Sequence, residues 1–422
     1  MSKILALGVG PLPFENQTKF YGSSIRTWHF IKPLLEQEHE ICLIAMQLPD
    51  PYHELNLEKL IQRTITDTPP GAQPWRYYSV DELSVFRDLK FLQQVHDEFQ
   101  PDGLLGINTH AAWMTAQIKS DKPFWADLNG YAMAEAQIKA YQVKDDKWIN
   151  YFWEQEKTII HRADIFSTVS LPQKYALIGE LATINRLNAA TANYDFVHHI
   201  PNSIENQAWQ HTKPVLRGKE VTDSDFVILW SGSYNTWTNI DFLFKGLTKA
   251  MEKNPRIKFV STGGKIDGHD DATYPRLVEM VNQSPLRDRF IFKGWIPLED
   301  AHNYYFETDL GLNIDGNNYE VVFGARNRLN SMMKAGLPIL TSLGSEITLV
   351  LDKEKLALTF PIGDVDKFAS QILWAAEHQD ELKTMGLKSK QYIFEQWTFE
   401  KTTKPVQTWA KNPIHAPDWK RH

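Results

Sequence analysis

Short apolar runs alternate with amphipathic segments along the first half of the chain. Unbroken apolar runs of this length are typical of strands buried on both faces of a parallel sheet. Between them apolar residues recur at helical spacing, first from Ser24 through Trp28 and Ile31. The pattern predicts strands at residues 4–9, 41–46, 103–107, 124–128, 165–169 and 196–200, and helices from about 24, over 85–99 and over 132–162.

The same rhythm restarts after a polar segment at residues 202–224, which we interpret as a linker. Thr238 followed three residues later by Asp241 is a capping-box spacing and predicts the start of a helix. Strand–helix alternation in both halves predicts an α/β chain with two Rossmann-like, doubly wound domains. The strands expected here are residues 226–230, 258–261, 290–293, 310–314, 339–341 and 357–360, and later helices are expected at 325–335 and 364–376.

Composition agrees with this organisation. The 422 residues are 42% hydrophobic and 23% charged with a net charge of −7, which excludes a mainly disordered chain and argues against a nucleic-acid partner. Cys42 is the single cysteine, so a disulfide framework or multi-cysteine zinc site is excluded. No apolar run is long enough to span a membrane; we expect a cytoplasmic protein, with peripheral membrane contact left open. The expected domains are 1–203, 204–391 and a tail, 392–422, that packs back on the first.

Ligands of open α/β sheets bind beyond the carboxyl ends of the strands, so the loops at those ends hold the candidate residues. In the first domain, Gly22 and Ser23 at a helix entrance can offer backbone N–H groups to an anion or simply cap the helix. His110 follows one expected strand, and Asp127 and Asn129 end the next. Asp127 either contacts a substrate or caps the following helix.

The loop after Trp230 is a second candidate. Small residues there allow a phosphate to approach backbone N–H groups, and Trp237 adds a flat apolar wall. A plain loop rarely combines such residues at the end of a strand. The residues expected to bind a ligand are Ser231, Gly232, Ser233, Asn235 and Trp237.

The segment from Asp315 to Arg328 carries the most specific charge pattern. Arg326 and Arg328 fall in the first turn of an expected helix, where cations oppose the helix dipole unless an anion lies nearby. A diphosphate would satisfy both arginines and the free N–H groups after Gly324. An ion pair between arginine and Glu320 is the alternative, and the two do not exclude each other.

Two acidic clusters have simpler explanations than a metal site. Residues 267–271 include three aspartates and a histidine, but neighbours in one loop seldom converge on one ion. Asp364 and Asp366 open an expected helix, which makes an N-cap the simplest role. We therefore expect no metal.

These motifs resemble GT-B-fold glycosyltransferases, most closely family 4. The second half resembles their nucleotide-sugar domain, and the first is recognised mainly by the order of its elements. Family 4 usually has two glutamates eight positions apart near the helix that corresponds to 325–335, whereas here only Glu320 precedes that helix. The family's Arg and Lys in the first loop are also missing. The matching segments are the Gly-rich loop after 230, Lys293-Gly294-Trp295, Glu320 with Gly324, Ala335-Gly336-Leu337-Pro338, Gly344-Ser345-Glu346 and His198-His199-Ile200-Pro201-Asn202.

The resemblance implies transfer of a sugar from a nucleotide-sugar donor, with retention and without a metal or other cofactor. It places the donor base near Trp295 and Ile296, the diphosphate near the 231–237 loop, and the transferred sugar at Glu320. The acceptor, which is a small molecule, a glycan or a lipid-linked sugar, would enter near Gly22, His110 and Asp127. An inverting reaction would instead need a general base, for which Asp127 and His110 are the first-domain candidates. Two rival functions stay open, a nucleotide-sugar epimerase of the same fold and a non-enzymatic carbohydrate-binding protein. Donor alone would suffice for the first, and the second would bind sugar without a nucleotide.

Overall fold

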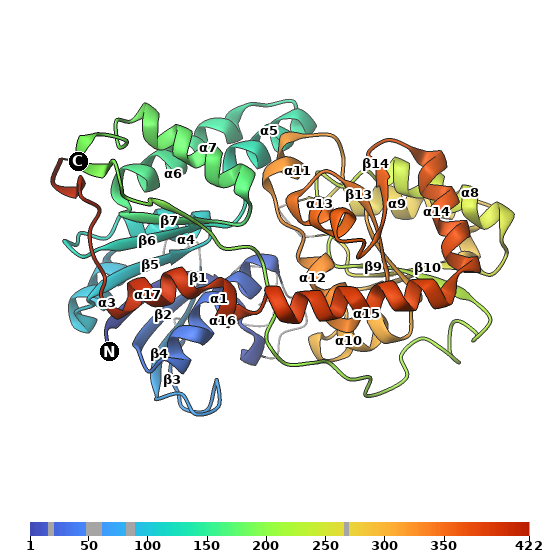
Figure 1. Ribbon diagram of the computed structural model, residues 1–422, viewed down its shortest axis with the longest axis horizontal. Coiled ribbons are helices and arrows are strands. Elements are labelled where there is room, and N and C mark those ends of the chain that lie inside the picture. Colours follow the sequence, from blue (N-terminus) through green and yellow to red (C-terminus); the bar gives the residue numbers. More distant parts are fainter. Residues whose placement is uncertain (16–20, 48–60, 82–88, 266–269, 422) are drawn as a thin grey trace. The chain divides into compact units, whose positions relative to one another are not determined.

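The computed structural model describes residues 1–15, 21–47, 61–81, 89–265 and 270–421. The chain forms two compact units, each built around its own sheet (Figure 1). The first unit comprises Met1–Asn202, Phe323–Ala325 and Phe399–His422, and the second comprises Ser203–Val322 and Arg326–Thr398.

The first sheet is parallel except at one edge. In the described residues its eight strands lie in the order β3-β4-β2-β1-β5-β6-β7-β8, and β3 pairs antiparallel with β4. Both of these outer strands lie outside the apolar runs that the sequence pattern identified. The bounds are β1 Lys3–Gly10, β2 Glu40–Gln47, β3 Ile61–Ile65, β4 Trp75–Asp81, β5 Gly103–Ile107, β6 Phe124–Leu128, β7 Ile165–Thr168 and β8 Val197–His199.

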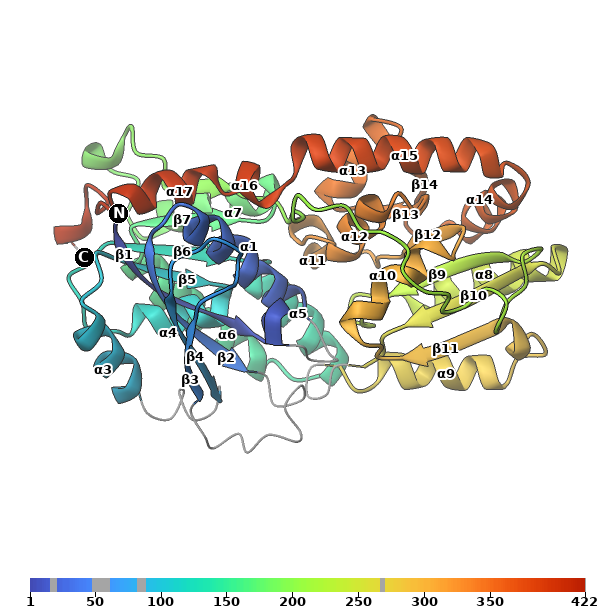
Figure 2. The same cartoon turned by 90° about the horizontal axis from the view of Figure 1, so that it is seen from below.

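Helices cover both faces of this sheet. Leu5 and Leu7 of β1 belong to one buried cluster and Ile4 and Ala6 to another, as the alternation of side chains along a strand requires. Figure 2 shows α17 on one side of the sheet and α3 and α4 on the other. The expected helix at 132–162 is two helices, with Lys144 in a left-handed conformation between them. The helices are α1 Gly22–Glu36, α3 Lys90–Phe99, α4 Thr109–Ala116, α5 Ala132–Val143, α6 Lys147–Arg162, α7 Leu171–Thr183, α16 Phe399–Thr402 and α17 Lys404–Lys411.

The second sheet is parallel throughout its described strands, in the order β11-β10-β9-β12-β13-β14. The two Rossmann-like domains expected from the sequence are therefore confirmed. The strands are β9 Phe226–Ser231, β10 Ile257–Thr262, β11 Phe290–Gly294, β12 Leu310–Asn313, β13 Ile339–Leu343 and β14 Leu358–Pro361, and the helices are α8 Ile240–Lys253, α9 Thr273–Asn282, α10 Leu298–Phe306, α11 Tyr319–Phe323, α12 Asn327–Ala335, α13 Glu346–Lys353, α14 Val365–Glu377 and α15 Gln379–Gln396.

The direction in which successive strands are added to the sheet reverses at β1 in the first unit and at β9 in the second. β1 lies between β2 and β5, and β9 lies between β10 and β12. Loops at such a switch point diverge and leave room for a ligand. The loops that follow β9 and β12 carry most of the donor-site candidates in the second unit, and Trp295 and Ile296 follow β11.

The segment expected to be a linker is fixed to the second unit. The Glu307 carboxylate accepts backbone N–H bonds from Val215, Leu216 and Arg217 at 2.6–2.9 Å. Asp309 accepts the Val227 N–H at 2.7 Å and pairs with Arg217 at 2.8 Å. Backbone N–H groups in and next to the expected linker are thus capped by the buried Glu307 and the half-buried Asp309 of the second unit.

The starts of α8 and α12 differ from the expected positions by one or two residues. α8 is capped by Asn239, whose side chain accepts the Phe242 N–H at 3.1 Å, rather than by Thr238. α12 begins at Asn327 rather than at residue 325, and Arg326 occupies its N-cap position. In the part of the chain that the structure describes, no helix is long and apolar enough to cross a membrane.

A buried acidic pair lies close to the expected acceptor loop. Glu156 of α6 is 1% exposed, and burial together with the nearby Glu180 raises its pKa well above the ordinary value of 4.5. Glu180 accepts a hydrogen bond from the Tyr131 hydroxyl at 2.5 Å. Since the folded state holds a proton that the unfolded state releases, this pair stabilises the fold below about pH 4.5 and loses that contribution as the pH rises.

Replacing Glu156 with glutamine should therefore flatten the pH dependence. We expect the free energy of unfolding of the native chain to fall as pH rises above the ordinary glutamate range, and to fall less in Glu156→Gln, by urea denaturation at several pH values. Glu154→Gln on the same helix, where the side chain is 66% exposed, is the control and should follow the native chain. Parallel curves for all three proteins would contradict the assignment.

Candidate functional site

Glycine turns end three neighbouring strands of the second sheet. Gly232 follows β9, Gly263 follows β10 and Gly294 ends β11, with φ of 88°, 106° and 64°. The Gly232 N–H donates to the Thr262 carbonyl at 2.7 Å, and the Gly263 N–H donates to the Gly294 carbonyl at 2.6 Å. A Cβ on Gly263 would lie 2.4 Å from the Gly232 carbonyl oxygen. Only glycine at 263 therefore allows these two turns to approach so closely.

The loop 231–237 is anchored by one aromatic residue. The Tyr234 ring is fully buried and stacks on Trp230, with centroids 4.8 Å apart, and its hydroxyl is 2.8 Å from the Ser261 hydroxyl. Its N–H donates to the Gly264 carbonyl at 3.1 Å. The loop is thus held from within, whereas the expected ligand-binding residues Gly232, Ser233, Asn235 and Trp237 are half-buried and Ser231 is buried.

Arg328 closes one side of this loop. Its guanidinium lies 3.8 Å from the centre of the Trp230 ring, and Nη2 donates to the Ser233 carbonyl at 2.7 Å. Nη1 is buried and has no hydrogen-bond partner among the described residues. Burial lowers the pKa of Arg328 to about 10, so the side chain remains a cation at neutral pH. It is a positioned positive charge with an N–H group left over.

Arg326 is committed to an internal ion network instead. Its Nε donates to Asp315 at 2.8 Å, and Nη1 and Nη2 donate to the two oxygens of Glu320 at 2.9 and 2.8 Å. Asp315 is held in turn, since its N–H donates to the Ser342 hydroxyl and its carboxylate accepts from Asn313 at 2.9 Å. The arginine–Glu320 ion pair, which the sequence left as an alternative, is therefore present.

The charges in this network do not cancel. Two buried carboxylates face one guanidinium, and Arg326 and Glu320 are only 5% and 4% exposed. Burial would lower the pKa of Arg326, but the Asp315 and Glu320 carboxylates more than offset it and raise the pKa. Burial raises the pKa of Glu320, and the bond to Arg326 offsets part of that rise. Of the two arginines expected to clamp a diphosphate, Arg328 is the one whose N–H groups are not consumed by carboxylates.

The loops around these arginines are linked by backbone contacts. The Gly316 N–H donates to the Trp237 carbonyl at 3.0 Å, and the Arg326 guanidinium lies 5.9 Å from the Trp237 ring. Gly324 is buried just before α12. The half-buried Trp295 donates its indole N–H to the Lys265 carbonyl at 3.0 Å, and Ile296 beside it is also half-buried.

In the first unit, the expected acceptor residues converge through a residue that the sequence did not single out. Asn129 donates to the Asn108 side-chain oxygen at 2.9 Å, and Asn108 donates to the Ser23 carbonyl at 3.0 Å. Asn108 has φ of 76°, which is uncommon for a residue other than glycine. Strained backbone conformations of this kind cluster at functional sites. Gly22 begins α1, and His110, in the first turn of α4, contacts Trp113 with ring centres 5.4 Å apart.

Asp127 is more deeply buried than the half-buried Ser23, His110 and Asn129. It is fully buried, and its two oxygens accept from Arg26 Nη2 at 2.6 Å, Arg26 Nε at 2.9 Å and Ser167 Oγ at 2.7 Å. Neither a substrate contact nor the helix cap that the sequence suggested describes this residue. A carboxylate at the centre of a buried ion pair is poorly placed to accept a proton from an acceptor hydroxyl.

Two aspartates of the metal-like clusters cap helices, and two others pair with lysines, Asp271 with Lys265 and Asp366 with Lys249. Asp364 accepts the Lys367 N–H at 2.8 Å at the start of α14, which confirms the expected N-cap. Asp270 accepts the Ala272 and Thr273 N–H groups ahead of α9, and residues 267–269 lie outside the described chain. Within the described ranges, no three His, Cys, Asp or Glu side chains are arranged to hold a metal ion.

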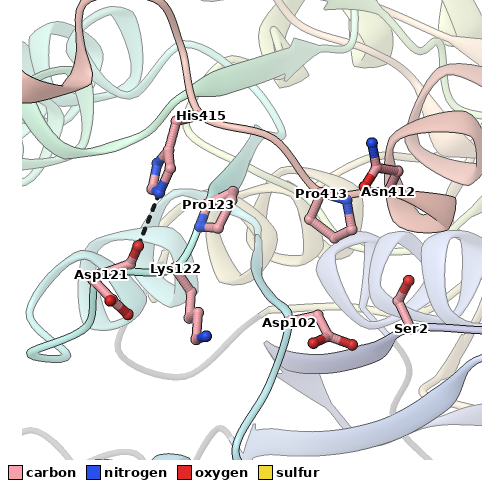
Figure 3. Close-up of a pocket in the computed structure, with 8 residues that line it drawn as sticks. All are labelled: Ser2, Asp102, Asp121, Lys122, Pro123, Asn412, Pro413 and His415. Atoms are coloured by element: carbon pink, nitrogen blue, oxygen red, sulfur yellow. Dashed lines mark hydrogen bonds between the residues drawn. The ribbon is translucent and has the colours of Figure 1, made fainter.

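A polar pocket of about 400 Å³ lies at the opposite edge of the first sheet, as Figure 3 shows. Its lining residues Ser2, Asp102 and Pro123 precede β1, β5 and β6, so it opens at the amino ends of the strands. His415 Nε2 donates to the Asp121 carbonyl there at 2.8 Å (Figure 3). None of the expected site residues lines this pocket.

Replacing Arg326 with alanine should strongly destabilise the second unit. The change leaves two buried carboxylates without their cation, which typically costs about 3–5 kcal/mol of unfolding free energy. Urea denaturation measures the loss directly.

Arg276→Ala is the matched control, because Arg276 also binds a carboxylate in two bonds, to Asp241 at 2.6 and 2.8 Å, but both side chains are well exposed. It should cost about 0–1 kcal/mol. Equally small losses in both variants would contradict the internal pairing of Arg326.

Residues 225–378 match the protein family described as Glycosyl transferases group 1. The chain has no significant match among curated proteins. Sucrose-phosphate synthase from Thermosynechococcus elongatus is 16% identical with a TM-score of 0.68, over 97% of this chain and 98% of that one. Anabaena HepE in complex with UDP-glucose is 12% identical with a TM-score of 0.66, over 97% and 100%.

A third solved structure, the α,α-trehalose-phosphate synthase (UDP-forming) of Burkholderia xenovorans in complex with glucose-6-phosphate, is 9% identical with a TM-score of 0.67, over 97% of this chain and 100% of that one. The structural similarity establishes a shared fold, and at identities this low it establishes nothing more. The family match covers the segment that contains the glycine turns, Arg326 and Arg328. Residues 225–378 thus match the glycosyl transferases group 1 family, in a chain that has the GT-B fold.

Proposed function

We propose that the protein transfers a sugar from a nucleotide-sugar donor to an acceptor hydroxyl. The observation that carries the proposal is Arg328, a cation with an uncommitted N–H group beside a glycine-rich loop at the switch point of the second sheet. A diphosphate is the anion that fits a fixed guanidinium and adjacent backbone N–H groups. The group 1 family match over the same residues supports this choice.

In this proposal the second unit binds the donor and stabilises the leaving group. Negative charge develops on the diphosphate as the bond to the sugar breaks, and preorganised donors at that position are usually the largest catalytic contribution. Arg328 and the first N–H groups of α12 supply those donors without a metal ion. Trp295 and Ile296 flank the base, as the family resemblance implies.

Glu320 is assigned to the transferred sugar as an orienting acceptor. Its two oxygens are bound to Arg326, but each carboxylate oxygen has a second lone pair that a sugar hydroxyl can use. The ion network would fix the direction of that lone pair before the donor arrives. Arg326 then acts through Glu320 and not on the diphosphate.

The acceptor is assigned to the first unit, at the residues that Asn108 brings together. Ser23, Asn129 and His110 offer polar groups there, next to the start of α1 at Gly22. We propose retention of the anomeric configuration, in which the leaving phosphate itself takes the acceptor's proton. The burial of Asp127 supports this, because it removes one of the two side chains that an inverting reaction could use as a base.

The direct test is turnover of a defined donor. UDP-glucose is the first donor to try because HepE binds it, and sugar phosphates are the first acceptors because the Burkholderia enzyme binds glucose-6-phosphate; glycans and lipid-linked sugars follow. We expect acceptor-dependent release of UDP that persists in EDTA. An isomerised or freed sugar from donor alone would instead support an epimerase, and sugar binding without any nucleotide response would support a carbohydrate-binding protein.

Arg328→Gln should weaken nucleoside diphosphate binding while leaving the fold intact. A charge-assisted hydrogen bond contributes about 1.5–3 kcal/mol, or roughly ten- to hundred-fold in Kd, measurable by calorimetry with UDP. Arg276→Gln, on the exposed start of α9, should leave Kd unchanged. Unchanged affinity in Arg328→Gln would refute the diphosphate assignment.

The stereochemical outcome is a separate prediction. Proton NMR of the product should show the anomeric configuration of the donor. An inverted product would overturn retention and would require a base, for which His110 is the remaining candidate among the first-unit residues considered.

A further inference from the structure

A buried polar network in the first unit contacts two of the chain segments that join the units. Apart from residues 323–325, which also belong to the first unit, the chain passes from the first unit to the second at 202/203 and returns at 398/399. Arg26 of α1 and Asp127 of β6 form the centre of the network and are 1% and 0% exposed. We propose that this network is a positioning element, which sets where both connecting segments leave the first unit and ties them to the acceptor loop.

The outgoing segment is held by Arg26 directly. With Nε and Nη2 bound to Asp127, its Nη1 donates to the Ile200 carbonyl at 2.8 Å and lies 3.3 Å from the Asn202 side-chain oxygen. These contacts end at Asn202, the last residue before the boundary. The guanidinium therefore joins the end of β6 to the point where the chain departs.

The returning segment is held through His29. Arg26 can only donate, so His29 Nδ1, at 3.4 Å from Nη1, accepts, and Nε2 donates to the Thr402 hydroxyl at 2.7 Å. The His29 ring also stacks on Phe399, the first residue after the boundary, with centroids 4.7 Å apart. Burial and the charge of Arg26 hold the pKa of His29 well below 6.5, so this neutral arrangement is fixed across ordinary pH.

On the other side of the boundaries, the two segments pair with each other. The Ile204 N–H donates to the Trp397 carbonyl at 3.0 Å, and Ile204 forms an isolated parallel bridge with Thr398. The two joining segments, 202–204 and 397–399, are thus paired with each other, and we call them the strap. The Arg26–Asp127 network is their anchor in the first unit. Asn129, which binds Asn108 in the acceptor loop, lies two residues beyond Asp127, so a shift of the anchor reaches both the strap and the loop.

A second buried ion pair in the same unit provides a matched control. Arg186 donates to Asp418 at 3.1 Å in two bonds, and both side chains are as buried as those of Arg26 and Asp127. It holds the C-terminal tail, and the other contacts described for Arg186 are with the Ile160 and Ala163 carbonyls and the Phe166 and Phe196 rings, away from residues 200–204 and 397–402. Breaking either pair removes the same kind of interaction, but only one of the two is attached to the strap.

The experiment compares Asp127→Asn with Asp418→Asn in the full chain at a temperature where both remain folded. In Asp127→Asn we expect faster amide hydrogen exchange at 200–204 and 397–399, and kcat lowered on the order of ten- to a hundred-fold with the donor KM unchanged, as for a misplacement remote from the chemistry. In Asp418→Asn exchange in these segments and kcat should match the native chain.

Equal effects on exchange and kcat in the two variants would show that the network only stabilises the fold, and would overturn the proposal. A loss of kcat in Asp127→Asn with unchanged exchange would also overturn it, because Asp127 would then act in the chemistry. If Asp127→Asn does not fold, Thr402→Val, which removes the hydroxyl that His29 binds, should raise exchange at 397–399, and native-like exchange there would refute the anchor. The turnover readout rests on the proposed function, whereas the exchange readout does not, so a chain without transferase activity would still decide the role of the network.

Discussion

Charge balance at the carboxyl edge of the second sheet governs the rest of the site. Two arginines lie two residues apart at the start of α12, and two carboxylates, Asp315 and Glu320, lie within reach of one of them. Once Arg326 binds both, Arg328 is left to pack on Trp230 and to hold the Ser233 carbonyl. One guanidinium becomes part of the scaffold, and the other keeps an N–H group for an anion. We propose that this division of roles leaves Arg328 to bind the donor diphosphate.

Buried arginine–carboxylate pairs recur in the molecule, and each fixes a different segment. Arg26 with Asp127 holds the joining segments, Arg186 with Asp418 holds the C-terminal tail, and Arg326 with Asp315 and Glu320 holds the donor loops. Such pairs contribute little net stability because their desolvation offsets much of their attraction. Their geometry is strict, however, and they join elements far apart in sequence. Placement of segments, more than stability, explains why they lie where they do.

The strands with continuous apolar runs were predictable because burial on both faces demands such runs. The outer strands β3 and β4 were not, since Trp75–Asp81 mixes aromatic, charged and polar residues. The Arg326–Glu320 pair could be anticipated because the two residues are only six positions apart in the sequence. The partner of Asp127 could not, because Arg26 lies 101 residues away and only the packing of α1 against the sheet brings them together. Asn108 carried a weak signal as a polar residue at a strand end, and its conformation became visible only in the structure.

The central claim is that the second unit binds the donor diphosphate at Arg328 while Arg326 remains paired with its carboxylates. A crystal structure of the chain with UDP tests it most directly. The account predicts a diphosphate oxygen within about 3 Å of Arg328 Nη1, beside the 231–237 loop, with the Arg326–Glu320 bonds intact. A diphosphate bound to Arg326 in place of Glu320, or bound away from the glycine turns, would contradict it.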